Sequence, residues 1–225
     1  MTFGLPLSTP IAKDELAICV SPGAFGAHIG IAFHSVKDGQ KLLHLRWHKW
    51  LAVDAYPPEQ ECWIVCKLQL PPLLRAQLVG IVRSVAKRQP QISYAVNSIA
   101  GKGSFDPSGS YKPPKGSLGL TCASFVTEIF RAAKVPLLNE KTWVESAENI
   151  KWANDVIAML EMYGVDPDHV AAVRKSVDGI RIRPEEVGAA AYLPLKSLPA
   201  DYDTASSLAA QVMHNLANAY PTIAA

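Results

Sequence analysis

The chain has 225 residues, of which 49% are hydrophobic and 19% are charged, and its formal net charge is +2. This composition is typical of a globular protein with a substantial core. The near-neutral charge argues against a nucleic-acid-binding protein, because no broad basic field is present. No apolar stretch reaches the roughly eighteen residues that a membrane span requires, so no span is expected.

The length favours one main domain with an extension. We expect a catalytic domain over residues 1–141 and a helical extension over residues 142–225 that packs on it. The first ten residues lack a basic start followed by an apolar stretch, so no signal peptide is predicted. Four scattered cysteines favour reduced thiols and a protein that is cytoplasmic as synthesised. If the protein acts outside its cell, we expect a signal-independent secretion system to export it.

Several segments in the first third of the chain have the pattern of β-strands. Residues 15–20 form an apolar run, and residues 27–33 alternate between large apolar side chains and small or polar ones. Residues 41–48 follow the hairpin signal Asp38-Gly39, and residues 62–70 form a further apolar run. These segments predict an antiparallel sheet of about five strands.

The strongest helix pattern begins at Cys122, whose apolar residues recur on one face as far as Ala133. Thr121 can cap the start of this helix, and Pro136 ends it. An earlier helix is expected over about 71–88, and the pattern after Thr142 is helical. The predicted fold class is therefore α+β, with the Cys122 helix packed on one face of the sheet.

Cys122 is the candidate nucleophile. It lies in the first turn of its helix, directly after a stretch rich in glycine and serine. The N–H groups and the dipole of a helix N-terminus stabilise an anion there, and a thiolate is the form that attacks a substrate. The alternative is that Cys122 is an inert core residue at the start of an apolar face.

His28 is the candidate base. It shares a strand face with Gly30 and Ala32, and these small residues would let the Cys122 helix approach closely. A third polar group has to orient the base, with His44 as the first candidate and His48 as the alternative. The choice depends on the hairpin register. A two-residue turn places His28 and His44 on opposite faces, a three- or five-residue loop places them on one face, and a loop over residues 37–39 places His28 opposite His48.

Tyr94 is the candidate oxyanion donor. It precedes the glycine-rich stretch, and its hydroxyl could act beside the backbone N–H of Cys122. The alternative is a half-buried aromatic residue of a strand.

Three blocks of this sequence resemble the catalytic blocks of the NlpC-type papain-like hydrolases: AHIGIAF (27–33), KLLHL (41–45) and GLTCASFV (119–126). ISYAV, which contains Tyr94, is similar to the tyrosine block that stands upstream of the nucleophile in that family. The histidine block precedes the cysteine block, and this order resembles the circularly permuted branch, which includes lecithin retinol acyltransferase-like enzymes. The resemblance covers roughly residues 15–137. Thr121 departs from the asparagine of the permuted acyltransferases, which weakens the lipid acyltransferase interpretation.

The resemblance implies a permuted papain-like fold, a cysteine attack on a carbonyl and an acyl-enzyme formed with His28 as the base. The implied substrate is an amide in a peptidoglycan peptide, and a secreted antibacterial effector with an immunity or inhibitor protein as partner would fit. Isopeptidases, deamidases and lipid acyl hydrolases or acyltransferases on the same fold stay open. A catalytically silent module that binds a partner is the alternative from a different class.

Other chemistries have weaker support. The histidines between His28 and His48, with Cys62 and Cys66, could suggest a metal site, but His44 and His48 lie roughly 13 Å apart on a strand. Residues 100–104 imitate a phosphate loop without its first glycine, and no serine-hydrolase elbow occurs. We therefore expect neither a metal nor a cofactor.

Overall fold

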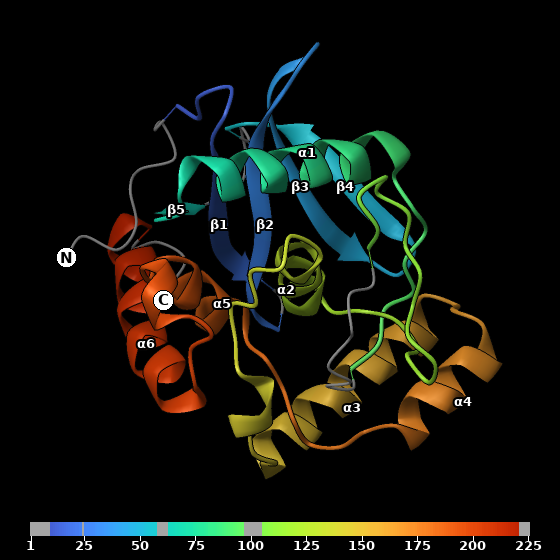
Figure 1. Ribbon diagram of the computed structural model, residues 1–225. Helices are drawn as coiled ribbons and strands as arrows, with labels where there is room; N and C mark the ends of the chain where they lie inside the picture. The colour runs from blue at the N-terminus through green and yellow to red at the C-terminus, as the bar shows by residue number, and fades with distance from the viewer. Residues whose placement is uncertain (1–9, 24, 58–62, 97–104, 221–225) are drawn as a thin grey trace.

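The computed structural model describes residues 10–23, 25–57, 63–96 and 105–220. Figure 1 shows an α+β fold in which a five-stranded antiparallel sheet in the order β4-β3-β2-β1-β5 carries six α-helices. The strands are β1 (Leu16–Gly23), β2 (Gly26–Ser35), β3 (Gly39–Trp47), β4 (Trp50–Ala55) and β5 (Ile64–Lys67). The prediction of an antiparallel sheet of about five strands beside a cysteine-bearing helix is confirmed.

The β2–β3 hairpin has a register that places the two predicted histidines on one face. Ser35 pairs with Gly39, so the turn consists of residues 36–38, one position earlier than the loop considered from the sequence. Pairing between β2 and β3 stops at Ile31 and Leu43. The two strands are therefore not hydrogen-bonded to one another at the end that carries His28.

Strand β4 was not predicted, because the turn that precedes it has no glycine, proline or asparagine. Trp47 pairs with Trp50, and Lys49 takes the left-handed conformation with φ 55° in the tight turn between them. This strand matters for the site because it carries Asp54, which pairs in register with Leu42 of β3.

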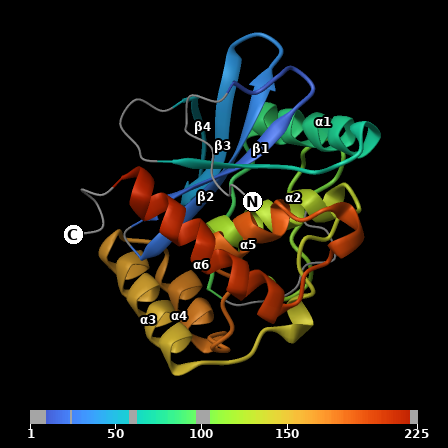
Figure 2. The same ribbon diagram turned by 90° about the vertical axis from the view of Figure 1, so that its left-hand side faces the viewer.

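Helices cover one face of the sheet and extend beyond the strand ends (Figures 1 and 2). The helices are α1 (Pro72–Arg88), α2 (Cys122–Ala132), α3 (Ala147–Met162), α4 (Pro167–Lys175), α5 (Pro184–Ala191) and α6 (Tyr202–Ala219). Both views place α1 and α2 on the same face, while α3 and α4 lie past the end of the sheet. Within the described ranges, no helix has both the length and the apolar character needed to cross a membrane.

The two faces of the sheet bury different side chains. Ile29 and Ile31 of β2 belong to the large core with the helices, including α2, whereas Ala32 and Leu42 belong to a smaller cluster on the opposite face. The expectation that α2 packs on the face of Gly30 and Ala32 is therefore wrong. The helix packs on the face of the larger side chains, because their greater apolar area gains more from burial.

Helices on both sides of residue 141 contribute to the large core. Phe125 and Ile129 of α2 belong to the same buried cluster as Ile157 of α3 and Val187 of α5. The division at residues 141 and 142 stays a prediction, but the helical extension shares its core with the sheet.

Candidate active site

The start of α2 is fixed by local hydrogen bonds. The Thr121 hydroxyl accepts a hydrogen bond from the Ser124 N–H at 3.0 Å, and the Ser124 hydroxyl accepts one from the Thr121 N–H at 2.8 Å. This capping box satisfies two N–H groups at the helix end and places Cys122 in the first turn, as the sequence predicted. Gly119 has φ +150°, and a Cβ there would lie 2.0 Å from the Ser93 carbonyl oxygen. Only glycine permits this approach of the loop before α2 to the Tyr94 segment.

The resting state of Cys122 is a thiol. Burial raises the pKa of Cys122 to about 11, although hydrogen bonds from the Tyr94 hydroxyl and from the backbone N–H groups of Ile29 and Ala123 act to lower it. The side chain is 7% exposed. The loss of water raises this pKa more than the hydrogen bonds lower it, whereas the sequence predicted that the helix N-terminus would favour the thiolate; the role of Cys122 as nucleophile stays a prediction. Nucleophilic attack then requires a base that takes the thiol proton.

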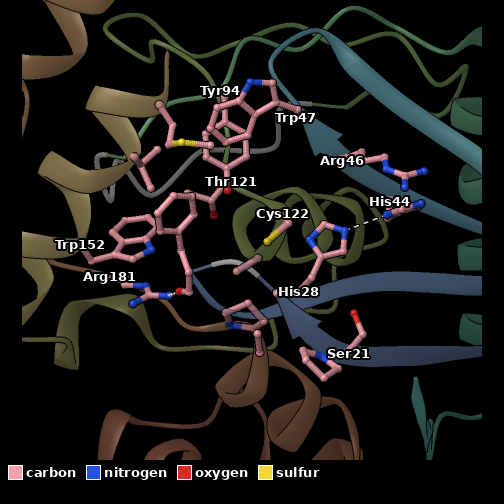
Figure 3. A pocket seen from close by; sticks show the side chains of 18 of the residues that line it. Ser21, His28, His44, Arg46, Trp47, Tyr94, Thr121, Cys122, Trp152 and Arg181 are labelled. Atoms are coloured by element: carbon pink, nitrogen blue, oxygen red, sulfur yellow. Dashed lines mark hydrogen bonds between the residues drawn. The ribbon is translucent and has the colours of Figure 1, made fainter. Parts of the chain in front are cut away.

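Figure 3 shows the imidazole of His28 between the side chains of Cys122 and His44, and all three residues line one cavity. Nε2 of His28 lies 2.7 Å from Nδ1 of His44, and Nε2 of His44 lies 2.8 Å from Oδ2 of Asp54. Figure 3 shows the other ring nitrogen of His28 on the side that faces the Cys122 sulfur. His28, His44 and Asp54 thus form a hydrogen-bonded series, and Cys122 lies on the wall of the same cavity as the two histidines.

This series assigns the tautomers of both histidines. A carboxylate oxygen only accepts hydrogen bonds, so Nε2 of His44 carries a hydrogen and donates it in a hydrogen bond to Asp54. When His44 is neutral, its Nδ1 has a lone pair and accepts from Nε2–H of His28. The remaining lone pair of His28 is on Nδ1, which is the position that a base for Cys122 requires.

Gly30 makes room for the orienting histidine. A Cβ at this position would lie 3.0 Å from Cβ of His44 and 3.0 Å from Cδ1 of Leu42. We expected Gly30 to leave room for a helix, but the space beside it is occupied by His44 of the neighbouring strand. His44 is 1% exposed, so its polar atoms depend on His28 and Asp54 for hydrogen bonds.

Trp63 closes the far side of the two imidazoles. Its ring centroid lies 5.6 Å from that of His28 and 5.7 Å from that of His44, both in edge arrangements, and its side chain is fully buried. Burial lowers the pKa of His28 to about 3, and the positive charge that His44 or Arg46 can carry lowers it further. His28 is thus neutral over the physiological range, and it accepts a proton less readily than a free imidazole.

Tyr94 is held at the nucleophile from two sides. Its hydroxyl hydrogen-bonds to the side chain and to the backbone N–H of Cys122. Its own N–H donates to Nδ1 of His48 at 3.2 Å, and its carbonyl oxygen lies 2.9 Å from Nε2 of His169. The geometry does not support His48 as the orienter of His28, because the hairpin register places His44 there and leaves His48 against the Tyr94 backbone.

A cavity of about 930 Å³ opens above these residues (Figure 3). It contains the four side chains predicted as the site, Cys122, His28, His44 and Tyr94. Its walls come from the β1–β2 turn, the β3–β4 turn, α3 and the segment before α5. The aromatic and aliphatic side chains among the lining residues are Phe25, Trp47, Trp50, Trp152, Val156, Met159, Tyr163 and Ile182.

The sequence analysis missed three residues of this site. Asp54 lies on the unpredicted strand, and Trp63 precedes β5 with no motif to mark it. Arg181 lines the cavity from a segment without regular structure, about 150 residues from His28 in the chain. Cys62 lies outside the described residues, and no three His, Cys, Asp or Glu side chains within them are grouped to hold a metal ion.

Comparison with known proteins gives no further guide to this site. No family model matches the chain, nor does any curated protein or solved structure.

Proposed function

We propose that the chain is a cysteine hydrolase of the permuted papain-like class that cleaves an amide bond through a thioester. The observation that carries this proposal is the hydrogen-bonded series from Asp54 through His44 to His28, together with the position of Cys122 and His28 on the wall of the same cavity. Papain-like enzymes use a cysteine, a histidine and a polar orienting group in these roles. The preferred substrate is a peptide of peptidoglycan, following the resemblance of the three sequence blocks.

In the proposed reaction, Nδ1 of His28 takes the thiol proton while the sulfur forms a bond to the carbonyl carbon. The Tyr94 hydroxyl and the Cys122 backbone N–H would donate hydrogen bonds to the resulting oxyanion. His28 then gives its proton to the amide nitrogen, the C–N bond breaks and the amine leaves. Water, deprotonated by His28, hydrolyses the thioester, which yields a carboxylic acid and restores the thiol.

An uncharged Cys122 thiol beside an uncharged His28 imidazole is the starting state that this sequence of proton transfers requires. Because the thiol and the imidazole are both uncharged at rest, the cavity holds no preformed ion pair. The energy of charge separation would be offset when His44 and Asp54 stabilise the imidazolium that forms on His28. Asp54 is 40% exposed, so it retains solvation while it orients His44.

A lipid acyl hydrolase or acyltransferase is the second candidate function. The observation that favours it is the apolar wall of the cavity, to which Val156 and Met159 of α3 and Trp47 of β3 contribute. An acyl chain could bury apolar area there at roughly 25 cal/mol per Å².

Mass spectrometry of the intact protein tests these candidates. The protein is incubated with purified peptidoglycan, ubiquitin-like conjugates or phospholipid vesicles, and quenched in acid to trap a thioester. We expect released peptide ends from peptidoglycan and an acyl adduct on Cys122 that is absent in Cys122→Ala. Products from phospholipids alone would favour the lipid function. A Cys122→Ala variant that retains every property of the native protein would favour the silent binding module.

A further inference from the structure

Arg181 is a cation in the cavity with no anionic partner in contact. Its Nη2 donates to the Phe25 carbonyl oxygen at 3.0 Å, and its guanidinium carbon lies 4.1 Å from the centre of the Trp152 ring. Its Nε is buried without a hydrogen-bond partner. Among the described residues, none forms an ion pair with Arg181 within 4.0 Å, and Glu185 acts on it only at longer range.

The rest of the cavity does not neutralise this charge. The other cation on its wall, Arg46, lies 3.7 Å from Asp54 and is stacked on Trp50 at 4.9 Å. Of the described residues that line the cavity, none is an aspartate or glutamate. A guanidinium that is partly removed from water loses solvation, so a site of this kind gains most when an anion binds.

Arg181 is also close to the reacting atoms. Burial raises the pKa of both Cys122 and Tyr94, and the positive charge of Arg181 acts on each in the opposite direction. Three separate elements fix the side chain: its own segment before α5, Trp152 on α3 and the backbone of the β1–β2 turn at Phe25. Such preorganisation keeps the ordering cost of binding small. Figure 3 shows Arg181 and Trp152 on one side of Cys122, opposite His28 and His44.

We propose that Arg181 is the specificity-determining residue of the site and binds a free carboxylate of the substrate near the bond that Cys122 attacks. This inference rests on the proposed function and narrows it to carboxylate-bearing acyl donors. The planar guanidinium suits this role because it can bind both oxygens of a carboxylate.

Matched alkylating reagents test the proposal on Cys122 itself. Iodoacetate and iodoacetamide differ mainly in charge, and in both reactions an S–C bond forms, iodide leaves and the thiol proton passes to His28. A second pair, 3-maleimidopropionic acid and its amide, extends the charged group further from the sulfur. The measured quantity is the rate on Cys122 for the anionic reagent divided by that for the neutral one, in the full-length protein.

We expect Arg181→Met to lower this ratio by about tenfold for at least one reagent pair, because a hydrogen bond to a charged group is lost. Arg181→Lys should retain part of the preference. The matched control is Arg183→Gln, which removes a cation that pairs with Glu148 at 3.2 Å outside the cavity and should leave the ratio unchanged. Equal slowing of both reagents in Arg181→Met would overturn the proposal, since Arg181 would then act only on thiol ionisation or on structure.

A second measurement separates this proposal from the proposed function. In Cys122→Ala, glutarate should raise the melting temperature more than glutaramide at equal ionic strength, and Arg181→Met in the same background should remove the difference. A shift that is unaffected by Arg181→Met, or no shift, would overturn the carboxylate site. If neutral reagents leave Cys122 unmodified while the Arg181-dependent glutarate shift persists, the hydrolase function fails and the carboxylate site stands.

Discussion

Nε2 of His28 lies 2.7 Å from Nδ1 of His44, and this contact joins the candidate base on β2 to the candidate orienting residue on β3. The two histidines lie on the face of the sheet opposite to α2, as the alternation along each strand shows. Cys122 therefore reaches His28 from the other face, at the end where β2 and β3 are no longer paired. The site depends on this unpaired end as much as on the side chains themselves.

Asp54→Asn should slow the reaction of Cys122 with iodoacetamide by about tenfold. An amide can present its NH₂ group to His44, which allows the wrong tautomer and leaves His28 without a defined acceptor for Nε2–H. The measurement is the second-order rate constant at pH 7.5. Asp38→Asn, at the exposed β2–β3 turn, is the matched control and should react like the native protein. Equal rates in all three proteins would show that Asp54 does not position His44 and His28 for the reaction of Cys122.

Gly30→Ala should destabilise the protein by about 1–3 kcal/mol and reduce Cys122 reactivity. The added methyl group would meet His44 and Leu42 at 3.0 Å, which forces the orienting histidine away from His28. The measurement is the free energy of unfolding in urea. Gly80→Ala provides the control, because a Cβ there meets nothing within 4 Å on an exposed helical turn. That change should stabilise the protein by about 0.5–1 kcal/mol.

Tyr94→Phe should separate oxyanion stabilisation from thiol reactivity. We expect hydrolysis of the substrate identified for the native enzyme to fall by about 100-fold, because one oxyanion donor is lost. Alkylation of Cys122 by iodoacetamide passes through no oxyanion, so its rate should change far less. Tyr111→Phe is the control, since this tyrosine does not line the cavity. If alkylation and hydrolysis fall together, Tyr94 acts through the thiol or the local structure instead.

Stability should decrease below about pH 6.5 in a way that depends on His28. Burial lowers the pKa of His28 in the folded state, so the unfolded state binds a proton more readily as the pH falls. The native protein should therefore lose stability between pH 7.5 and pH 5, and His28→Gln should lose less. The measurement is the urea midpoint at both pH values. The same loss in both proteins would show that His28 is not responsible.

Most of the residues that line the candidate site could be proposed from the sequence, because each of them lies in a local pattern. Cys122 begins an amphipathic helix, while His28 and His44 lie on neighbouring strands whose side chains alternate between the two faces of the sheet. That the side chains of His28 and His44 lie on one face of the sheet could not be derived from the sequence alone, because it depends on the hairpin register. The turn lies at residues 36–38, and the Asp38-Gly39 signal does not fix the position of the turn to within one residue.

The remaining residues had no comparable signal. In the turn before β4, Lys49 has a positive φ, and lysine is not a residue that predicts such a turn. Strand β4 and its Asp54 were therefore missed. Trp63 and Arg181 reach the site through tertiary packing from segments that lack a motif. The burial of Cys122, which raises its pKa, could not be read from the start of a helix either.

Site-resolved alkylation of Cys122 by iodoacetamide, followed across pH in the native protein and in His28→Ala, tests the central claim most directly. The fraction of Cys122 present as thiolate rises with pH toward its pKa of about 11, so the alkylation rate should rise with pH in both proteins. The account predicts that His28→Ala lowers the rate at pH 7.5 by about 100-fold, because the thiol loses the base that takes its proton. Equal rates in the two proteins between pH 6 and pH 9 would contradict the Cys122–His28 pair.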